Sequence, residues 1–189
     1  SELFALLGKK VHLVVEQEEI LPGFDEVLTN AVLQQLSKYG ISVSAHPPVK
    51  AETVINCSLR RAVLPEMKMH CSAGDNGFIE VDRWCQTSIE GIYAAGDVTG
   101  LSYLAQPASI QGVTAVNHMA GIRPEEDQFV YPLTVYGIPE IAQAGYTETE
   151  IRERNIGYKT AVFSFSVNGK ALAEGDSEGF VRVLYEERF

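Results

Sequence analysis

The order strand, helix, strand across residues 11–44 constrains the fold of this chain more than any other feature of its sequence. Residues 11–15 are a short apolar run that is typical of a strand, and residues 41–44 are the next expected strand. Between them, residues 25–39 repeat apolar side chains at helical spacing, with Asp25 placed as the N-cap. Because strands joined by a helix pair in parallel, we expect a βαβ unit in an α/β domain.

Three further strands and then one helix are expected along the middle of the chain. Buried strands are expected at residues 53–57 and 92–97, and a smaller strand at 77–82 lies between them. A helix is expected at residues 106–120, where Pro107 falls in the first turn and is tolerated. The middle of the chain therefore fits the same α/β class.

The last third of the chain has a different pattern. The polar segment 121–129 is the expected linker. Beyond it, Thr147 and Glu150 have the spacing of a capping box for a short helix, and segments 159–165 and 179–185 have strand patterns. This part is expected to be an α+β domain of its own.

Composition excludes several classes of protein. Hydrophobic residues make up 46% of the chain, which is typical of a globular protein. Acidic residues outnumber basic ones 25 to 15, so no basic surface is available for nucleic acid. No apolar run reaches the roughly 20 residues that a membrane span requires. We expect neither nucleic acid nor membrane as a partner.

Three cysteines, Cys57, Cys71 and Cys85, are well separated and form no CxxC or CxxxxC pair. An odd, scattered set does not make a disulfide framework, so we expect free thiols and a reducing, cytoplasmic compartment. The four histidines have no ligand spacing with these cysteines, so no metal site is expected.

Glu16 follows the first apolar strand directly. In a dinucleotide-binding fold, an acidic residue at this place accepts hydrogen bonds from the adenosine ribose hydroxyls and repels a 2′-phosphate. No basic residue follows among positions 17–19, so NAD is favoured over NADP. The alternative is an ordinary solvated acid at the end of a strand.

Residues 87–98 have the sequence Thr-Ser-Ile-Glu-Gly-Ile-Tyr-Ala-Ala-Gly-Asp-Val. Asp97 is expected at the carboxyl end of a strand, where it can bond a polyol hydroxyl, and Gly96 allows the backbone to approach a ligand. The helix that starts near Gln106 offers unpaired amides to an electron-rich ring. The alternatives are a capping aspartate in a turn and a purely structural helix start.

These residues resemble the pyridine nucleotide–disulfide oxidoreductase family, and they are nearest in pattern to its dihydrolipoamide dehydrogenases. Segment 87–98 resembles the second flavin-binding signature of the family, and segment 104–112 resembles the helix that lies against the flavin. Segment 9–25 is similar to part of the NAD domain, and segment 131–145 to the opening of the dimerisation domain. The resemblance implies FAD and NAD as cofactors.

Site roles are implied by the same resemblance. Gly96 and Asp97 would hold the FAD ribityl chain or the nearby phosphate region, and Glu16 would hold the NAD adenosine ribose. The residues expected to line the flavin are Tyr103, Leu104, Ala105 and Gln106. The expected fold is a Rossmann-like FAD/NAD(P)-binding piece followed by part of an α+β dimerisation domain.

The implied domains are a partial NAD-binding domain at 1–76, the end of an FAD-binding domain at 77–122, and half of a dimerisation domain at 123–189. The last of these implies a homodimer. The family's first Gly-rich loop, its CxxxxC pair and its His–Glu pair are absent from this sequence. We therefore expect an internal piece of a longer enzyme, with no catalytic residue and no activity of its own.

The resemblance implies that, in the longer enzyme, a hydride passes between NADH and flavin, and electrons pass to a cysteine pair and then to a small disulfide or a lipoyl domain. Mercuric reductase, glutathione reductase and soluble transhydrogenase types stay open, as does a non-catalytic dimerising scaffold. The family has Gly-Arg-Arg-Pro at an NAD contact, where this chain has Leu-Arg-Arg-Ala at 59–62. Segment 48–54 is shorter than in the family, so a break is expected there and near Leu59.

Overall fold

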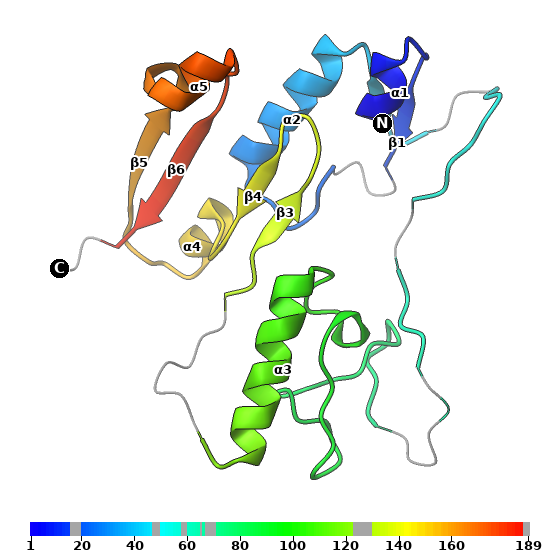
Figure 1. Ribbon diagram of the computed structural model, residues 1–189, viewed down its shortest axis with the longest axis vertical. Coiled ribbons are helices and arrows are strands. Elements are labelled where there is room, and N and C mark those ends of the chain that lie inside the picture. Colours follow the sequence, from blue (N-terminus) through cyan, green and yellow to red (C-terminus); the bar gives the residue numbers. More distant parts are fainter. Residues whose placement is uncertain are drawn as a thin grey trace. The chain divides into compact units, whose positions relative to one another are not determined.

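The computed structural model describes residues 1–15, 20–46, 50–57, 60–64, 66, 71–122 and 130–186. Figure 1 shows its elements, which in chain order are α1 (Glu2–Leu6), β1 (His12–Val14), α2 (Glu26–Lys38), β2 (Ser42–Ser44), η1 (Asp97–Thr99), α3 (Ala105–Met119), β3 (Leu133–Val135), β4 (Ile141–Gln143), α4 (Glu148–Glu153), β5 (Lys159–Ser164), η2 (Phe165–Val167), α5 (Gly169–Glu174) and β6 (Phe180–Tyr185). None of the described helices is both long and apolar enough to cross a membrane.

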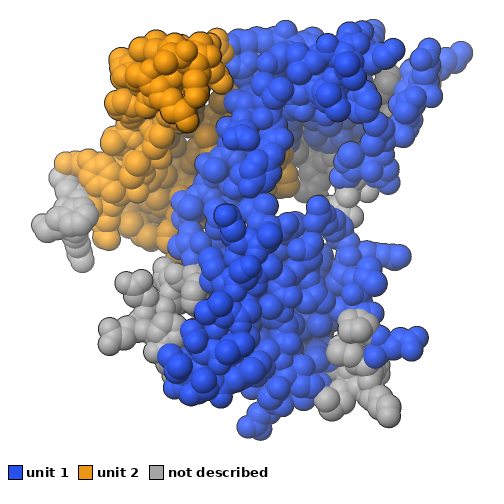
Figure 2. Space-filling model, viewed as in Figure 1, with its two compact units in different colours: residues 1–20, 32–145 blue, residues 21–31, 146–189 orange. Residues whose placement is uncertain are grey.

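The chain forms two compact units, which Figure 2 shows in blue and orange. Unit 1 contains Ser1–Ile20 and Val32–Gly145, and unit 2 contains Leu21–Ala31 and Tyr146–Phe189. Each unit therefore combines segments that are distant in sequence.

The expected strand, helix and strand of the first part are confirmed. Strand β1 pairs in parallel with β2, in the register His12↔Ser42 to Val14↔Ser44. Asp25 caps α2 as expected, because its Oδ1 accepts a hydrogen bond of 3.1 Å from the Val27 amide. The α2 residue Leu36 is almost fully buried. Helical periodicity and a cap residue were thus sufficient to predict this strand–helix–strand segment.

Three expected strands in the middle of the chain are wrong. Residues 53–57 form no strand and are exposed, with Val54 83% exposed. Segments 77–82 and 92–97 make only isolated bridges, such as Val81↔Thr87 and Gln86↔Tyr93. A strand needs a continuous ladder with a neighbour, and the described residues supply none at these places. The break expected between Pro48 and Val54 and near Leu59 falls partly outside the described residues, which omit 47–49 and 58–59, and residues 50–54 form no strand.

Helix α3 matches the expected helix and has two contrasting faces. The buried face carries Pro107, Gln111, Thr114 and Ala115. The rest of the helix surface exposes four large apolar side chains, Ile110, Val113, Val116 and Met119. One face of α3 therefore holds the middle of the chain together, while the other is open.

Unit 2 contains the antiparallel pair β5 and β6, in the register Lys159↔Tyr185 to Ser164↔Phe180, as their alternating patterns predicted. Every residue of β5 is exposed, whereas β6 alternates between half-buried and exposed positions. The expected capping box is present, because Thr147 accepts from the Glu150 amide and Glu150 accepts from the Thr147 amide.

A charged cluster joins distant segments within unit 2. Arg182 Nη1 lies 3.0 Å from Asp25 Oδ1, and its Nη2 contacts Glu148. The Glu148 amide donates to Asp25 Oδ2 at 2.9 Å, and Arg152 Nη2 lies 2.6 Å from Glu148 Oε1. Asp25 and Arg182 are largely buried, so this cluster fixes residue 25 against α4 and β6.

Candidate functional site

Asp97 starts the short turn η1 rather than ending a strand. Gly96, just before it, has φ +84°, a left-handed conformation that side-chain-bearing residues rarely adopt. The turn is closed by a hydrogen bond of 2.8 Å from Thr99 Oγ1 to the Gly96 carbonyl. The Asp97 carboxylate is 59% exposed, so it is available to a ligand.

The start of helix α3 is open to solvent. Its N-cap, Leu104, provides no side-chain cap, and Ala105 and Gln106 in the first turn are exposed. The first amides of a helix carry partial positive charge when no side chain caps them. This helix end can therefore face an electron-rich group.

Gly96 and helix α3 are in direct contact. The Gly96 amide donates to Oε1 of Gln111, which is completely buried, at 2.6 Å. A Cβ added at Gly96 would lie 3.7 Å from the Ala108 Cβ. The turn that presents Asp97 is thus held against the same helix whose first turn is open.

A second contact fixes the far end of α3. The Trp84 and His118 rings stack at 5.5 Å with an interplanar angle of 4°, and the Tyr93 hydroxyl lies 2.9 Å from His118 Nδ1. The segment from Trp84 to Gly96 is therefore attached to α3 at both ends, through His118 and Gln111. Neither Gln111 nor His118 was singled out from the sequence, although helical spacing places Gln111 on the buried face with Pro107.

Arg60 is the third residue whose place in the site sequence reasoning missed. Its Nη1 lies 3.1 Å from Asp97 Oδ2, and its guanidinium lies 5.3 Å from the centroid of the Tyr103 ring. The departure of this segment from the family's Gly-Arg-Arg-Pro put an NAD contact there in doubt, and the structure brings Arg60 to Asp97 instead. No local pattern signals this pair, because 37 residues separate its members.

The remaining expected residues have different outcomes. Glu16 lies outside the described residues. The three cysteines are all free: Cys57 is exposed, Cys71 is half-buried and Cys85 is buried. Burial, and secondarily the charge of Asp82, raises the pKa of the Cys85 thiol. No cluster of three metal-ligating side chains occurs among the described residues, and the structure pairs none of these thiols.

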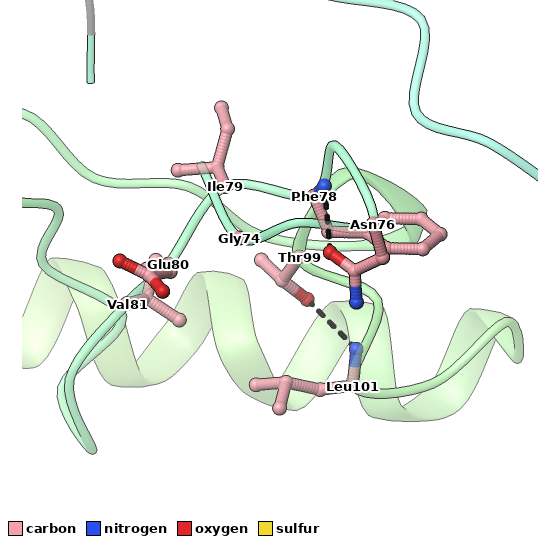
Figure 3. Close-up of a pocket in the computed structure, with 8 residues that line it drawn as sticks. All are labelled: Gly74, Asn76, Phe78, Ile79, Glu80, Val81, Thr99 and Leu101. Atoms are coloured by element: carbon pink, nitrogen blue, oxygen red, sulfur yellow. Dashed lines mark hydrogen bonds between the residues drawn. The ribbon is translucent and has the colours of Figure 1, made fainter. Parts of the chain in front are cut away.

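An open pocket of about 420 Å³ has Thr99, the last residue of η1, in its lining (Figure 3). It is lined by apolar Phe78, Ile79, Val81 and Leu101, with Asn76 and Glu80 among the polar residues. Gly100 is required here, since a Cβ at this position would come within 2.7 Å of the Phe78 ring. Phe78 also packs against Tyr103, with ring centroids 6.1 Å apart. A residue that lines the pocket is therefore in contact with one of the residues expected to line the flavin.

Family models match nearly the whole chain. Two models described as pyridine nucleotide-disulphide oxidoreductase match residues 1–53 and 49–112, and the dimerisation domain of the same group matches 131–189. The second range contains Asp97 and the start of α3.

Relatives of known name are similar along the chain. A dihydrolipoyl dehydrogenase of Bacillus subtilis (strain 168) is 33% identical, over 97% of this chain and 39% of that protein. Another, from Geobacillus stearothermophilus, is 29% identical over 96% of this chain and 44% of that protein. The chain thus spans less than half the length of these relatives.

Solved structures share the fold. LpdA from Mycobacterium tuberculosis superposes with a TM-score of 0.76 at 23% identity, over 98% of this chain and 46% of that one. The HOCl-induced flavoprotein disulfide reductase RclA from Escherichia coli gives 0.77 at 19% identity, over 98% and 48%. These likenesses confirm the expected fold class, a Rossmann-like nucleotide-binding piece followed by part of an α+β dimerisation domain.

Proposed function

Because this chain belongs to the pyridine nucleotide–disulphide oxidoreductase family, whose cofactors are FAD and NAD(H), we propose that it supplies cofactor contacts to a dihydrolipoyl dehydrogenase-like enzyme. The overall reaction proposed is the transfer of a hydride from NADH, with a proton from solvent, to a lipoamide-type disulfide. The products are NAD⁺ and the dithiol, and the reverse direction is equally available.

The observation that carries this proposal is the exposed Asp97 carboxylate on a turn held directly against the open start of α3. A carboxylate accepts hydrogen bonds from polyol hydroxyls, and free helix amides stabilise electron density on a ring edge. Gly96 has no side chain to obstruct a ligand. These groups fit the ribityl chain and pyrimidine edge of a flavin, which supplies hydride and electron transfer when bound.

The residues of this chain bind and orient, and none of them carries the electron transfer to the disulfide. A thiolate pair is required for that step, and Cys57, Cys71 and Cys85 are three separate free thiols. We therefore propose that the redox-active cysteine pair of the enzyme does not include Cys57, Cys71 or Cys85.

A flavin titration tests the proposal. FAD added to the 189-residue chain is expected to bind weakly, with a change in the flavin absorbance spectrum. The Asp97→Asn variant should lower the affinity by about tenfold, the value of one charge-assisted hydrogen bond. Asp176→Asn removes the same charge at an exposed site in unit 2 and should leave the affinity unchanged. Equal binding by the two variants would refute the role of Asp97.

The NAD contact is proposed for Glu16, and the domain division for residues 1–76, 77–122 and 123–189. The match of a family model to residues 1–53 supports the first assignment. A carboxylate at this place accepts from a 2′-hydroxyl and repels a 2′-phosphate. Saturation-transfer NMR should therefore detect NADH more readily than NADPH, and Glu16→Gln should remove the difference.

A homodimer formed through residues 123–189 is proposed from the match of the dimerisation model to 131–189. Strands β5 and β6 expose apolar side chains, among them Val162, Phe163, Val181 and Val183. Uncovered apolar surface of this kind is typical of association sites. Light scattering at micromolar concentration should give twice the mass of the chain, whereas the mass of a monomer would count against the dimer.

A non-catalytic dimerising scaffold is the second candidate, and the three free cysteines favour it. Both candidates predict that the 189-residue chain with added FAD shows no NADH-dependent turnover of lipoamide or of a diaphorase dye. The two candidates differ in flavin binding, which the dihydrolipoyl dehydrogenase-like function requires and the scaffold function does not. Turnover by the chain itself would contradict both, because it would need a redox centre other than these cysteines.

A further inference from the structure

Arg60 contacts two of the residues assigned to the flavin site. Its Nη1 donates to Asp97 Oδ2 at 3.1 Å, and its guanidinium stands over the Tyr103 ring at 5.3 Å. Arg60 is 65% exposed and Asp97 59% exposed, so both lie where a ligand can reach them. One cationic side chain therefore links the acidic and the aromatic member of the site.

The geometry of the pair leaves Asp97 able to bind. An ionised carboxylate offers about four lone-pair positions on its two oxygens. The contact with Arg60 engages Oδ2, so acceptor positions on Oδ1 are not used by this pair. Holding the carboxylate in one orientation before a ligand arrives reduces the entropy lost on binding.

The charge of Arg60 also suits an anionic cofactor. FAD carries two phosphate groups, and an uncompensated carboxylate beside them repels them. A guanidinium 3.1 Å from Asp97 offsets that negative charge while the carboxylate keeps its acceptor function. The lysine ammonium is a compact point charge and lacks the planar guanidinium fork of arginine. A lysine at position 60 can therefore replace the positive charge, but it orients the Asp97 carboxylate less well.

We propose that Arg60 is a positioning residue of the flavin site, which fixes the Asp97 carboxylate for the ribityl hydroxyls and neutralises its charge. This inference rests on the proposed function, since it requires that the chain bind FAD through Asp97. Arg61, the next residue, is exposed as well and provides a matched control.

FAD titrations of the 189-residue chain test the role of Arg60. Arg60→Gln should weaken binding by about fivefold, the upper range for an exposed ion pair. Arg60→Lys should restore part of the affinity, and Arg61→Gln should match the parent chain. In the Asp97→Asn background, Arg60→Gln should have no further effect, because its effect passes through Asp97.

Each other result overturns the inference in a recognisable way. Unchanged or tighter binding by Arg60→Gln would mean that Arg60 is neutral or competes with the flavin. A loss that persists in the Asp97→Asn background would mean that Arg60 contacts the cofactor itself. Failure of the parent chain to bind FAD at millimolar concentration would instead overturn the proposed function, before any variant is compared.

Discussion

Gln111 accepts a hydrogen bond of 2.6 Å from the Gly96 amide through Oε1, and it is the most deeply buried polar residue in the described part of the chain. Its Nε2 has no hydrogen-bond partner of good geometry among the described residues. The Oε1 end of this side chain holds the Asp97 turn.

Replacing Gln111 by leucine should destabilise unit 1 by about 1–3 kcal/mol, because the Gly96 amide loses its acceptor. The measurement is the urea midpoint followed by circular dichroism. Gln106→Leu makes the same chemical change at an exposed position of α3 and should shift stability by less than about 0.5 kcal/mol. Equal shifts in the two variants would show that the Gly96 contact is unimportant.

Arg182→Met should destabilise unit 2 by roughly 2 kcal/mol, a value between those for exposed and fully buried ion pairs. The substitution removes the Arg182 guanidinium from the largely buried Asp25 carboxylate. Lys170→Met is the control, because Lys170 is highly exposed and lies 3.8 Å from Glu174. The prediction fails if thermal unfolding midpoints of the two variants are the same.

Unit 2 should lose stability in acid through Glu148. Hydrogen bonds from the Tyr158 hydroxyl and then from Arg182 lower the pKa of Glu148 from 4.5 to about 2. A carboxyl whose pKa is lower in the folded state stabilises the fold above pH 4.5, and this contribution is lost as the pH falls towards 2. The difference in urea midpoint between the parent chain and Glu148→Gln should shrink over that range. A difference that is independent of pH would contradict this account.

Thiol labelling should separate the three cysteines. The exposed Cys57 should react first with an aromatic disulfide reagent, and the half-buried Cys71 more slowly. Cys85 should react only on unfolding, since it is buried and burial raises its pKa, which lowers the thiolate fraction. Cys57→Ser should remove the fast phase alone. Rapid labelling of Cys85 in the native protein would show that its surroundings open readily.

The sequence was sufficient where local rules decide the structure. Asp25 caps α2, Pro107 lies in the first turn of α3, and Thr147 with Glu150 forms the capping box. Each depends on residues a few positions apart, so a single sequence records it. The parallel pairing of β1 with β2 followed from the helix between them.

Long-range contacts decided the rest. Residues 53–57 and 92–97 have strand-like side chains, but a strand also requires a neighbour, which no local pattern specifies. The residues of the Asp97 turn were found because they are adjacent in sequence. Arg60 was not found, because it is 37 positions away and no local pattern joins it to Asp97. Gln111 was missed because a buried polar side chain is unusual on the inner face of a helix.

The salt bridge between Asp25 and Arg182 sets an order of events on the ribosome. Its members are 157 residues apart, and Glu148, which shares the cluster, is also made late. At roughly 5–20 residues per second, translation separates Asp25 from Arg182 by about 8–30 s. The nascent βαβ segment can form early, yet residues 21–31 gain their partners in unit 2 only when β6 emerges. Completion of unit 2 therefore waits until Arg182 has been synthesised, long after the βαβ segment.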